Sequence, residues 1–278
     1  MRGFFLVMKA ELIRTFIVMR RYWFRTLTGL IIGYGMLMVL IAGFIYSRPM
    51  VREGLSRLDD PAAATNFVLG FIIGMYAFGV VGMFTQGIQG MATTGVLEQL
   101  CLSPYGLTTN FLAQTFIASI TSILSSGFMV YLVTWTVGGV LHWDTLPVLV
   151  LLALTFFNLI GFGFMVGGLV LIFKQVGQVA VILRMVLFGL AVFAREEILN
   201  NPLPVRLVLH LLPVTDAAIC LKYVLIQGQL REGQFHSVFL HPCFYWLVFN
   251  GTMWTLVGLA VFRWMEDYSR TKGTLGTY

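Results

Sequence analysis

The sequence predicts an all-α integral membrane protein with six membrane-spanning helices, an amphipathic helix before them and a helical hairpin between the fifth and the sixth. Its 278 residues are 58% hydrophobic and only 11% charged, whereas soluble domains are roughly 25% charged. Apolar runs of about 18 residues or more recur along the chain, and in hydrocarbon such runs are stable only as helices that satisfy their own backbone hydrogen bonds. A further apolar segment, bounded by prolines, is too short to cross a bilayer.

Residues 1–25 form the predicted amphipathic helix, which we expect to remain in the protein because no signal-peptide pattern is present. Six basic side chains lie in this stretch against one acid, Glu11. Arg14, Arg21 and Arg25 fall on one helical face. The pattern fits an interfacial helix on an anionic cytoplasmic leaflet. It fits equally an ordinary positive flank that orients the first span.

The six predicted spans follow this helix. They cover residues 27–46, 66–88, 109–140, 146–173, 178–195 and 243–263. Because the basic cluster precedes the first span, the positive-inside rule places the N-terminus in the cytoplasm, and an even number of spans returns the C-terminus there. We therefore expect a multi-pass membrane protein with both termini in the cytoplasm. Glycines four residues apart, at Gly29/Gly33, Gly70/Gly74 and Gly163/Gly167, predict close helix packing within the bundle.

The region of residues 196–240 contains two short apolar segments. Residues 205–212 are followed by Pro213, and as a helix they would be only about 12 Å long, against roughly 30 Å of hydrocarbon. Residues 215–227 begin with Thr-Asp, a helix-start signal, and are followed by a glycine. We interpret the pair as a re-entrant hairpin, which is stable at membrane depth only when it packs against protein or a wet cavity.

A few polar side chains inside the spans, with one proline of the hairpin, are the candidate translocation path or gate: Ser119, Ser122, Ser126, Asn158, Arg184 and Pro213. The serines share one helical face, where they either line a polar path or simply pack and bond to preceding carbonyls. A charge at the centre of a span costs about 2.5 to 3.5 kcal/mol on insertion scales. Arg184 is therefore either an anchor that snorkels to the inner interface beside Lys174 or a gating or substrate-contacting charge.

Several kinds of chemistry are not supported by the sequence. No lysine follows a glycine in a G-K-[ST] pattern, so there is no Walker A nucleotide site. The three cysteines include no C-x-x-C pair, which argues against a disulfide framework or a zinc ribbon. His236, His241 and Cys243 are a weak metal group, and no metal site is predicted. A serine nucleophile at Ser126 lacks a histidine on a following predicted span to act as its base.

The region of residues 89–108 joins the second span to the third. Its centre, residues 94–104, is a short island between two apolar segments and must lie at a bilayer surface. We expect a helix of one or two turns there, ended by the Ser-Pro dipeptide of residues 103 and 104.

Two segments resemble the permease subunits of type-2 ATP-binding-cassette exporters. TGVLEQLCLSP is similar to the family's G-T-x-E-Q-L-x-x-S-P segment after the second span, with Val96 in place of a common threonine. LPVRLVLHLLPVTDAAICLKYVLIQGQ is similar to the family's external hairpin, with Lys222 near a position where many relatives have arginine. The resemblance extends over nearly the whole chain and implies a single exporter transmembrane domain at residues 1–278.

The resemblance implies that the island is a coupling helix that docks on a separate ATPase. The residues implied are Leu97, Glu98, Gln99, Leu100, Cys101, Ser103 and Pro104. Leu97, Leu100 and Cys101 would supply apolar contacts, whereas Glu98 and Gln99 would supply polar ones. Alternatively, Glu98 makes no contact with a partner and only stabilises the helix through its interaction with the positive end of the helix dipole.

The resemblance also implies the composition of the complex and its activity. Two cytoplasmic ATPase subunits would bind ATP and Mg, with no cofactor in this chain. The other partners would be a second permease copy or paralogue and membrane lipid, with no nucleic acid. The complex would lie in a bacterial-type inner (plasma) membrane and export a drug-like, lipid or glycan-type substrate. The alternatives are an intramembrane enzyme and an ATP-independent channel or carrier.

Overall fold

The fold is entirely helical in the part of the chain that the structure describes. This computed structural model describes the backbone of residues 2–46, 61–137, 145–173, 177–194, 201–227 and 238–272. The first five helices are α1 (Arg2–Arg21), α2 (Trp23–Tyr46), α4 (Pro61–Thr93), α5 (Val96–Leu102) and α6 (Gly106–Val137). They are followed by α7 (Thr145–Phe173), α8 (Gly177–Phe193), α9 (Leu203–Leu211), α10 (Thr215–Gln227) and α11 (Pro242–Thr271).

Among the described residues, 4 helices are long and apolar enough to cross a membrane. They are Asn66–Thr93, Gly106–Val133, Leu146–Phe173 and Pro242–Thr271. The bent pair formed by α9 and α10 adds a fifth if it is counted as one span. Two shorter apolar helices, Trp23–Val39 and Gln178–Phe193, occupy the first and the fifth predicted spans. The class predicted from composition is confirmed, with 4 to 5 candidate spans where the sequence predicts six.

Each predicted span lies on a helix, but the ends differ. α8 has 17 residues, which makes it about 26 Å long, less than the roughly 30 Å hydrocarbon core. α11 continues to Thr271, well past the predicted end at residue 263, because helical backbone bonding does not require apolar side chains. The predicted ends at residues 140 and 195 fall outside the described residues. Hydropathy thus locates the helices but not their ends.

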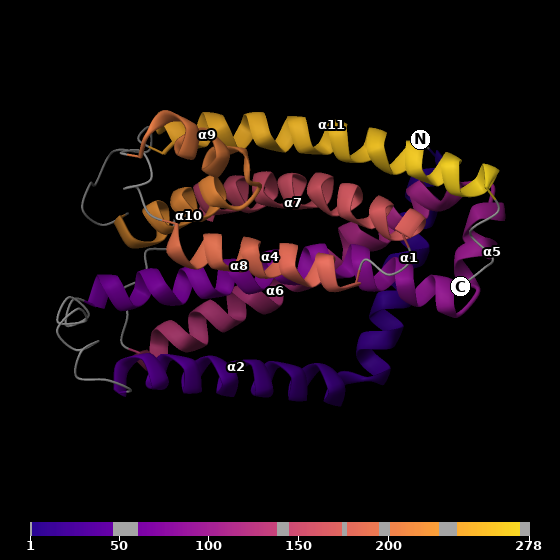
Figure 1. The fold of residues 1–278 in the computed structure, drawn as a ribbon. Coiled ribbons are helices and arrows are strands. Elements are labelled where there is room, and N and C mark those ends of the chain that lie inside the picture. The colour runs from indigo at the N-terminus through magenta and orange to yellow at the C-terminus, as the bar shows by residue number, and fades with distance from the viewer. Residues whose placement is uncertain are drawn as a thin grey trace.

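The long helices lie side by side along the molecule (Figure 1). α4 contacts α6, α7 and α8, and α11 packs along α7. The short helix α5 lies at one end together with α1 and the last turns of α11, whereas the bent pair of α9 and α10 lies at the opposite end. The two segments that the sequence singles out are therefore separated by the full length of the bundle.

An aromatic cluster fills the core where α4, α6, α7 and α11 meet. Phe84 and Phe164 lie edge to face with ring centroids 4.8 Å apart, and Phe164 meets Phe262 in the same way at 5.0 Å. Phe111 completes the cluster at 5.2 Å from Phe84. Edge-to-face pairs of this kind contribute about 0.5 to 1.5 kcal/mol each beyond their buried area, so the cluster holds four helices to one another.

Glycines allow the closest helix contacts. A Cβ on Gly74 would lie 2.8 Å from Phe188 of α8, and one on Gly163 would overlap the ring of Phe84 of α4, so these predicted packing sites do pack within the chain. The tightest approach was not predicted. A Cβ on Gly258 of α11 would overlap the carbonyl of Gly161 of α7, so these two backbones touch directly.

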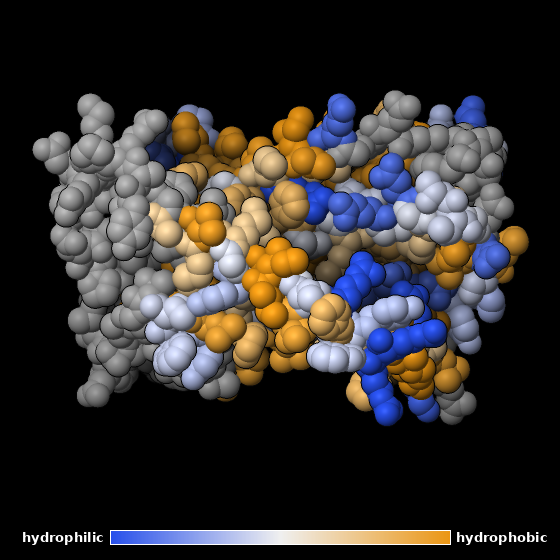
Figure 2. All heavy atoms as spheres, turned by 90° about the horizontal axis from the view of Figure 1, so that it is seen from below, coloured by the Kyte–Doolittle hydropathy of each residue, from blue (hydrophilic) through white to orange (hydrophobic). Residues whose placement is uncertain are grey.

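One face of the molecule shows an apolar middle beside a hydrophilic end. Figure 2 shows hydrophobic side chains over the centre of this face and hydrophilic ones gathered toward the end that holds α1 and α5. The exposed basic side chains of α1 and of the start of α2 are Lys9, Arg14, Arg20, Arg21 and Arg25. Such a basic border is typical of a helix end at the surface of an anionic membrane.

Candidate functional site

The short helix α5 is framed by two glycines with left-handed backbone. Gly95 has φ 72° and is the N-cap of α5, and Gly106, with φ 71°, is the first residue of α6. Positive φ of this size is readily adopted only by glycine. Ser103 is the C-cap, and its backbone N–H donates to the Leu100 carbonyl. The predicted short helix ended by Ser-Pro is confirmed.

The side chains of α5 divide between the protein core and an exposed face. Leu97 is completely buried, and Leu100 and Cys101 pack partly buried against the core. Leu102 is 86% exposed, and Val96 and Gln99 are exposed on the same side of the helix at spacings of three residues. Leu97, expected to contact a partner, instead anchors α5 from within. The exposed face of Val96, Gln99 and Leu102 is the surface that α5 offers.

The remaining residues of the predicted coupling set flank that face. Ser103 is half-buried and Pro104 is exposed. The side chain of Glu98 lies outside the described part of the structure, so neither of its two predicted roles is tested.

A polar contact ties the beginning of α6 to the end of α11. The Thr108 hydroxyl donates to Glu266 Oε2 at 2.7 Å, and Arg270 donates to Glu266 Oε1 at 2.6 Å. The Glu266 side chain is only 8% exposed. Sequence reasoning missed this contact because 158 residues separate Thr108 from Glu266. The turn that leaves α5 is thereby attached to the last helix.

The bent helix pair has the predicted order of short helix, proline corner and short helix. α9 and α10 meet at 84°, and α10 begins at Thr215 and ends at Gln227, as the Thr-Asp signal predicts. Pro213 is buried at the corner. α9 begins two residues earlier than expected, at Leu203, with Pro204 in its first turn, where proline is well tolerated.

Side chains of α11 satisfy the last carbonyls of α9. Asn250 Nδ2 donates to the His210 carbonyl, and Trp254 Nε1 donates to the Leu211 carbonyl at 2.9 Å. Carbonyls in the last turn of a helix lack partners within the helix. These contacts were not predicted, because nothing in the local sequence pairs residues 210 and 250.

A buried polar pair spans the corner itself. His210 Nδ1 lies 2.7 Å from Asp216 Oδ1, with the two side chains 0% and 1% exposed. Asn250 Nδ2 lies 3.5 Å from the other carboxylate oxygen. The His210 ring stacks on Trp246 with ring centroids 5.0 Å apart. The sequence signal that could have found the pair is the placement of a histidine and an aspartate on either side of a helix-breaking proline.

Lys222 joins α10 to the end of α8. Its Nζ donates to the carbonyls of Ala191, Val192 and Ala194 at 2.9 to 3.0 Å, and the residue is only 5% exposed. A cation at this point also interacts favourably with the negative end of the α8 dipole. The cation therefore caps α8 from a neighbouring element.

The predicted path residues lie on different helices, in mostly buried positions. Arg184 Nε donates to the Phe78 carbonyl at 2.9 Å, and its guanidinium lies 3.7 Å from the centroid of the Phe78 ring. It is thus held in the seam between α4 and α8. Ser119 is buried, and Ser122 and Ser126 are half-buried on α6. Asn158 is buried on α7, and neither of its amide atoms has a hydrogen-bond partner among the described residues.

The basic residues of the N-terminal helix remain at the surface. Arg14, Arg21 and Arg25 are exposed, and Arg14 donates to Glu11 at 3.0 Å. α1 ends at Arg21, and α2 begins at Trp23 after a break at Tyr22. Figure 1 shows α1 meeting α2 at an elbow, so the interfacial segment and the first apolar helix are separate elements.

Comparison with protein families finds a match to the ABC-2 type transporter over residues 7–226. The matched range starts within α1, includes α5 and stops one residue before the end of α10. Comparison with curated proteins and with solved structures finds no significant match. Because the family match covers well over half of the sequence and contains α5 and nearly all of the bent helix pair, the chain belongs to the ABC-2 type transporter family, as a membrane component of such a transporter.

Proposed function

We propose that this chain is the permease subunit of an ATP-driven exporter and that α5 is the surface on which a separate ATPase subunit docks. Membership of the ABC-2 family implies partnership with ABC ATPase subunits, which bind the ATP and Mg. The substrate is of a drug-like, lipid or glycan type, and a second permease copy or paralogue completes the translocation path.

The observation that carries the proposal is the exposed face of α5. A 7-residue helix between two long apolar helices, framed by left-handed glycines, presents Val96, Gln99 and Leu102 outward while Leu97 fixes it from within. An isolated helix of this length is not stable, so its shape depends on the anchoring residue and the turns. An outward leucine on a helix that is already held in place loses little conformational freedom when a partner binds.

The proposed topology follows from the same arrangement. α2, α4, α6, α7, α8 and α11 cross the membrane, α1 lies at the cytoplasmic interface through its basic side chains, and α9 with α10 re-enters from the outside. This is supported by the positions of α1, α5 and the end of α11 at one end of the bundle and of the bent pair at the other (Figure 1). Both termini are then cytoplasmic.

Substrate passes between two permeases and leaves past the bent helix pairs. The path residues we propose are Ser119, Ser122, Ser126, Asn158, Arg184 and Pro213. Asn158 supports this role best, since a buried amide without hydrogen-bond partners gains one when a polar ligand or water enters. Arg184 contributes by holding α4 against α8, since its guanidinium is engaged by Phe78.

The test is co-purification of the chain with its partner ATPase, followed by ATP hydrolysis and export of a lipophilic dye by the reconstituted complex. Leu102→Asp with Gln99→Arg places opposite charges on the proposed docking face. We expect ATPase binding at least tenfold weaker, which corresponds to about 1.4 kcal/mol. Leu240→Asp, at a residue that is 67% exposed beside α11, is the matched control and should bind normally.

Three outcomes would contradict the proposal. Normal ATPase binding by the double variant would remove α5 as the docking face. Dye movement by the permease alone in liposomes, without any ATPase, would favour the channel or carrier. A hydrolytic activity that is lost in Ser126→Ala and needs no ATPase would favour the intramembrane enzyme.

A further inference from the structure

We propose that His210, Asp216 and Cys243 form a binding site for a divalent metal ion of Zn²⁺ type at the corner of the bent helix pair. The three residues each offer one ligand atom, and these atoms all lie within 4.8 Å of one another. All three residues are buried. The site does not depend on the proposed export function, because it rests only on the geometry of this corner.

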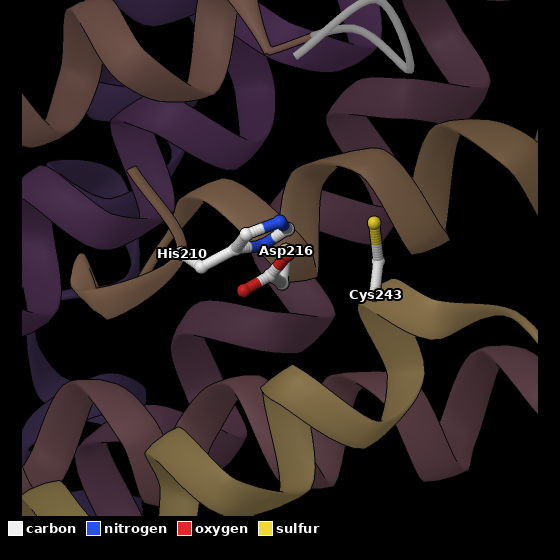
Figure 3. A group of neighbouring side chains, drawn as sticks. All are labelled: His210, Asp216 and Cys243. Atoms are coloured by element: carbon white, nitrogen blue, oxygen red, sulfur yellow. Dashed lines mark hydrogen bonds and ion pairs between the residues drawn. The ribbon is translucent and has the colours of Figure 1, made fainter. Parts of the chain in front are cut away.

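The site is assembled from three elements. His210 lies in the last turn of α9, Asp216 in the first turn of α10 and Cys243 in the first turn of α11. Figure 3 shows His210 and Asp216 side by side, with the Cys243 thiol across from them at the start of α11. The first turn of a helix is where a carboxylate or a thiolate is stabilised by the positive end of the dipole.

The donor set matches the preference of Zn²⁺. Cysteine sulfur, histidine nitrogen and a carboxylate oxygen are the ligands this ion takes in proteins. A tetrahedral zinc shell places neighbouring ligand atoms roughly 3.3 to 3.6 Å apart. Here the His210 and Asp216 atoms lie 2.7 Å apart and no ligand pair exceeds 4.8 Å, so small side-chain rotations reach that spacing.

Buried polar atoms around the cluster indicate that a further group completes it. His210 Nε2 and Asn250 Oδ1 are both buried, and neither has a hydrogen-bond partner among the described residues. Such atoms are uncommon in proteins, and the Asn250 Oδ1 acceptor is suited to a water bound as the fourth ligand, which zinc sites with three protein ligands keep. A hydrogen bond between the Cys243 thiol and the Asp216 carboxylate brings the second anionic ligand to the first. Asn250 also lies beside the cluster, 3.5 Å from Asp216 Oδ2.

The charges and protons of the binding step balance. The Cys243 thiol loses its proton to solvent, Asp216 binds as a carboxylate and His210 binds as a neutral imidazole. The two anionic ligands then neutralise the divalent ion, which is favourable at a buried position. The bound ion fastens α9, α10 and α11 to one another at the end of the bundle opposite α5.

Co²⁺ is a suitable probe for this site, because a cobalt ion bound by thiolate has a near-ultraviolet charge-transfer band that binding to surface histidines does not produce. The full-length protein is purified in detergent, freed of its affinity tag and treated with a chelator. We expect about one Co²⁺ per chain with this band, displaced by Zn²⁺, because Zn²⁺ is bound more tightly than Co²⁺ by most such sites.

Two variants locate the site. Cys243→Ser should lose the charge-transfer band and bind Zn²⁺ at least about tenfold more weakly. Loss of a group that only supports a ligand already weakens metal binding by about tenfold or more, and Cys243 is itself a ligand. Cys220→Ser, which changes another buried cysteine of the bent pair outside the cluster, should retain both. Wild-type protein without a thiolate band would overturn the proposal, as would a band that persists in Cys243→Ser. If Cys243→Ser does not fold, a thiolate band that is present in wild type and retained in Cys220→Ser supports the site. Loss of the band in Cys220→Ser contradicts it.

Discussion

Two buried cations in this chain bond to backbone carbonyls of neighbouring helices. Lys222 of α10 donates to the carbonyls at the end of α8, and Arg184 of α8 donates to Phe78 of α4. Hydrogen bonds to a charged donor are worth about 1.5 to 3 kcal/mol each. In an apolar surrounding, these two side chains therefore join three elements without surface salt bridges.

Lys222→Met should destabilise the protein. The substitution keeps an unbranched side chain but leaves the carbonyls of Ala191, Val192 and Ala194 without this donor. A buried polar group left unsatisfied costs about 1 to 3 kcal/mol, so we expect a clearly lower melting temperature of the detergent-solubilised protein. Lys272→Met, at an exposed lysine just beyond α11, serves as the control. An unchanged melting temperature in Lys222→Met would show that the cap contributes little.

Sequence reasoning identifies these side chains but not their partners. Lys222 and Arg184 are conspicuous as charges in apolar segments, yet their partners lie up to 106 residues away. Leu97 illustrates the same point, since an apolar residue in a surface helix can face either a partner or the protein's own core. Only the packing of α5 against α4 and α6 decides that it faces inward.

At the scale of the helices, α7 and α11 form the most closely packed pair. Gly161 and Gly258 meet backbone to backbone, and Thr255 Oγ1 donates to the Phe157 carbonyl at 3.1 Å one turn away. Contacts between small residues of this kind allow membrane helices to associate without a hydrophobic driving force.

Gly258→Ala should separate this pair. The added methyl group would overlap the Gly161 carbonyl, and overpacking of a closely packed site typically costs about 1 to 3 kcal/mol. We expect a lower yield of folded protein and a lower unfolding temperature. Both can be measured by fluorescence-detected size-exclusion chromatography, the second after heating the sample. Gly189→Ala is the control, because a Cβ there meets nothing within 4 Å. Equal unfolding temperatures of the two variants would mean that α7 and α11 accommodate the methyl group without loss of stability.

Element boundaries were predictable only where a local signal marks them. The Thr-Asp start of α10 and the Ser-Pro end of α5 agree with the structure, because capping depends on neighbouring residues. The close contact of α7 with α11 was not predicted. Gly161 and Gly258 lie far apart in sequence, and no sequence pattern within either helix distinguishes them from the other glycines of the spans.

At the scale of the whole molecule, the two segments that carry the family resemblance lie at opposite ends of the bundle (Figure 1). Composition alone predicts the class, because a chain this apolar has no alternative to membrane helices. The number of crossings is less accessible from sequence, since α8 is short and the described apolar part of α2 extends only from Trp23 to Val39.

The proposed orientation can be measured by cysteine labelling in intact cells. Leu102 and Leu240 are highly exposed, on α5 and beside α11. In a Cys101→Ser background, where Cys220 and Cys243 are buried, an impermeant maleimide should label Leu240→Cys directly. It should label Leu102→Cys only after the membrane is permeabilised. The reverse pattern would invert the topology, and equal labelling would contradict the placement of the two sites on opposite sides.

The contacts of α11 have a mechanical consequence. Its 30 residues make a rod about 45 Å long. Toward its C-terminus Glu266 holds Thr108 beside α5, and nearer its N-terminus Asn250 and Trp254 hold the last turn of α9. Between these two attachments, the backbone of Gly258 contacts α7. Because α11 is also held against α7 along its length, a single helix connects the turn beside α5 to the corner of α9 and α10.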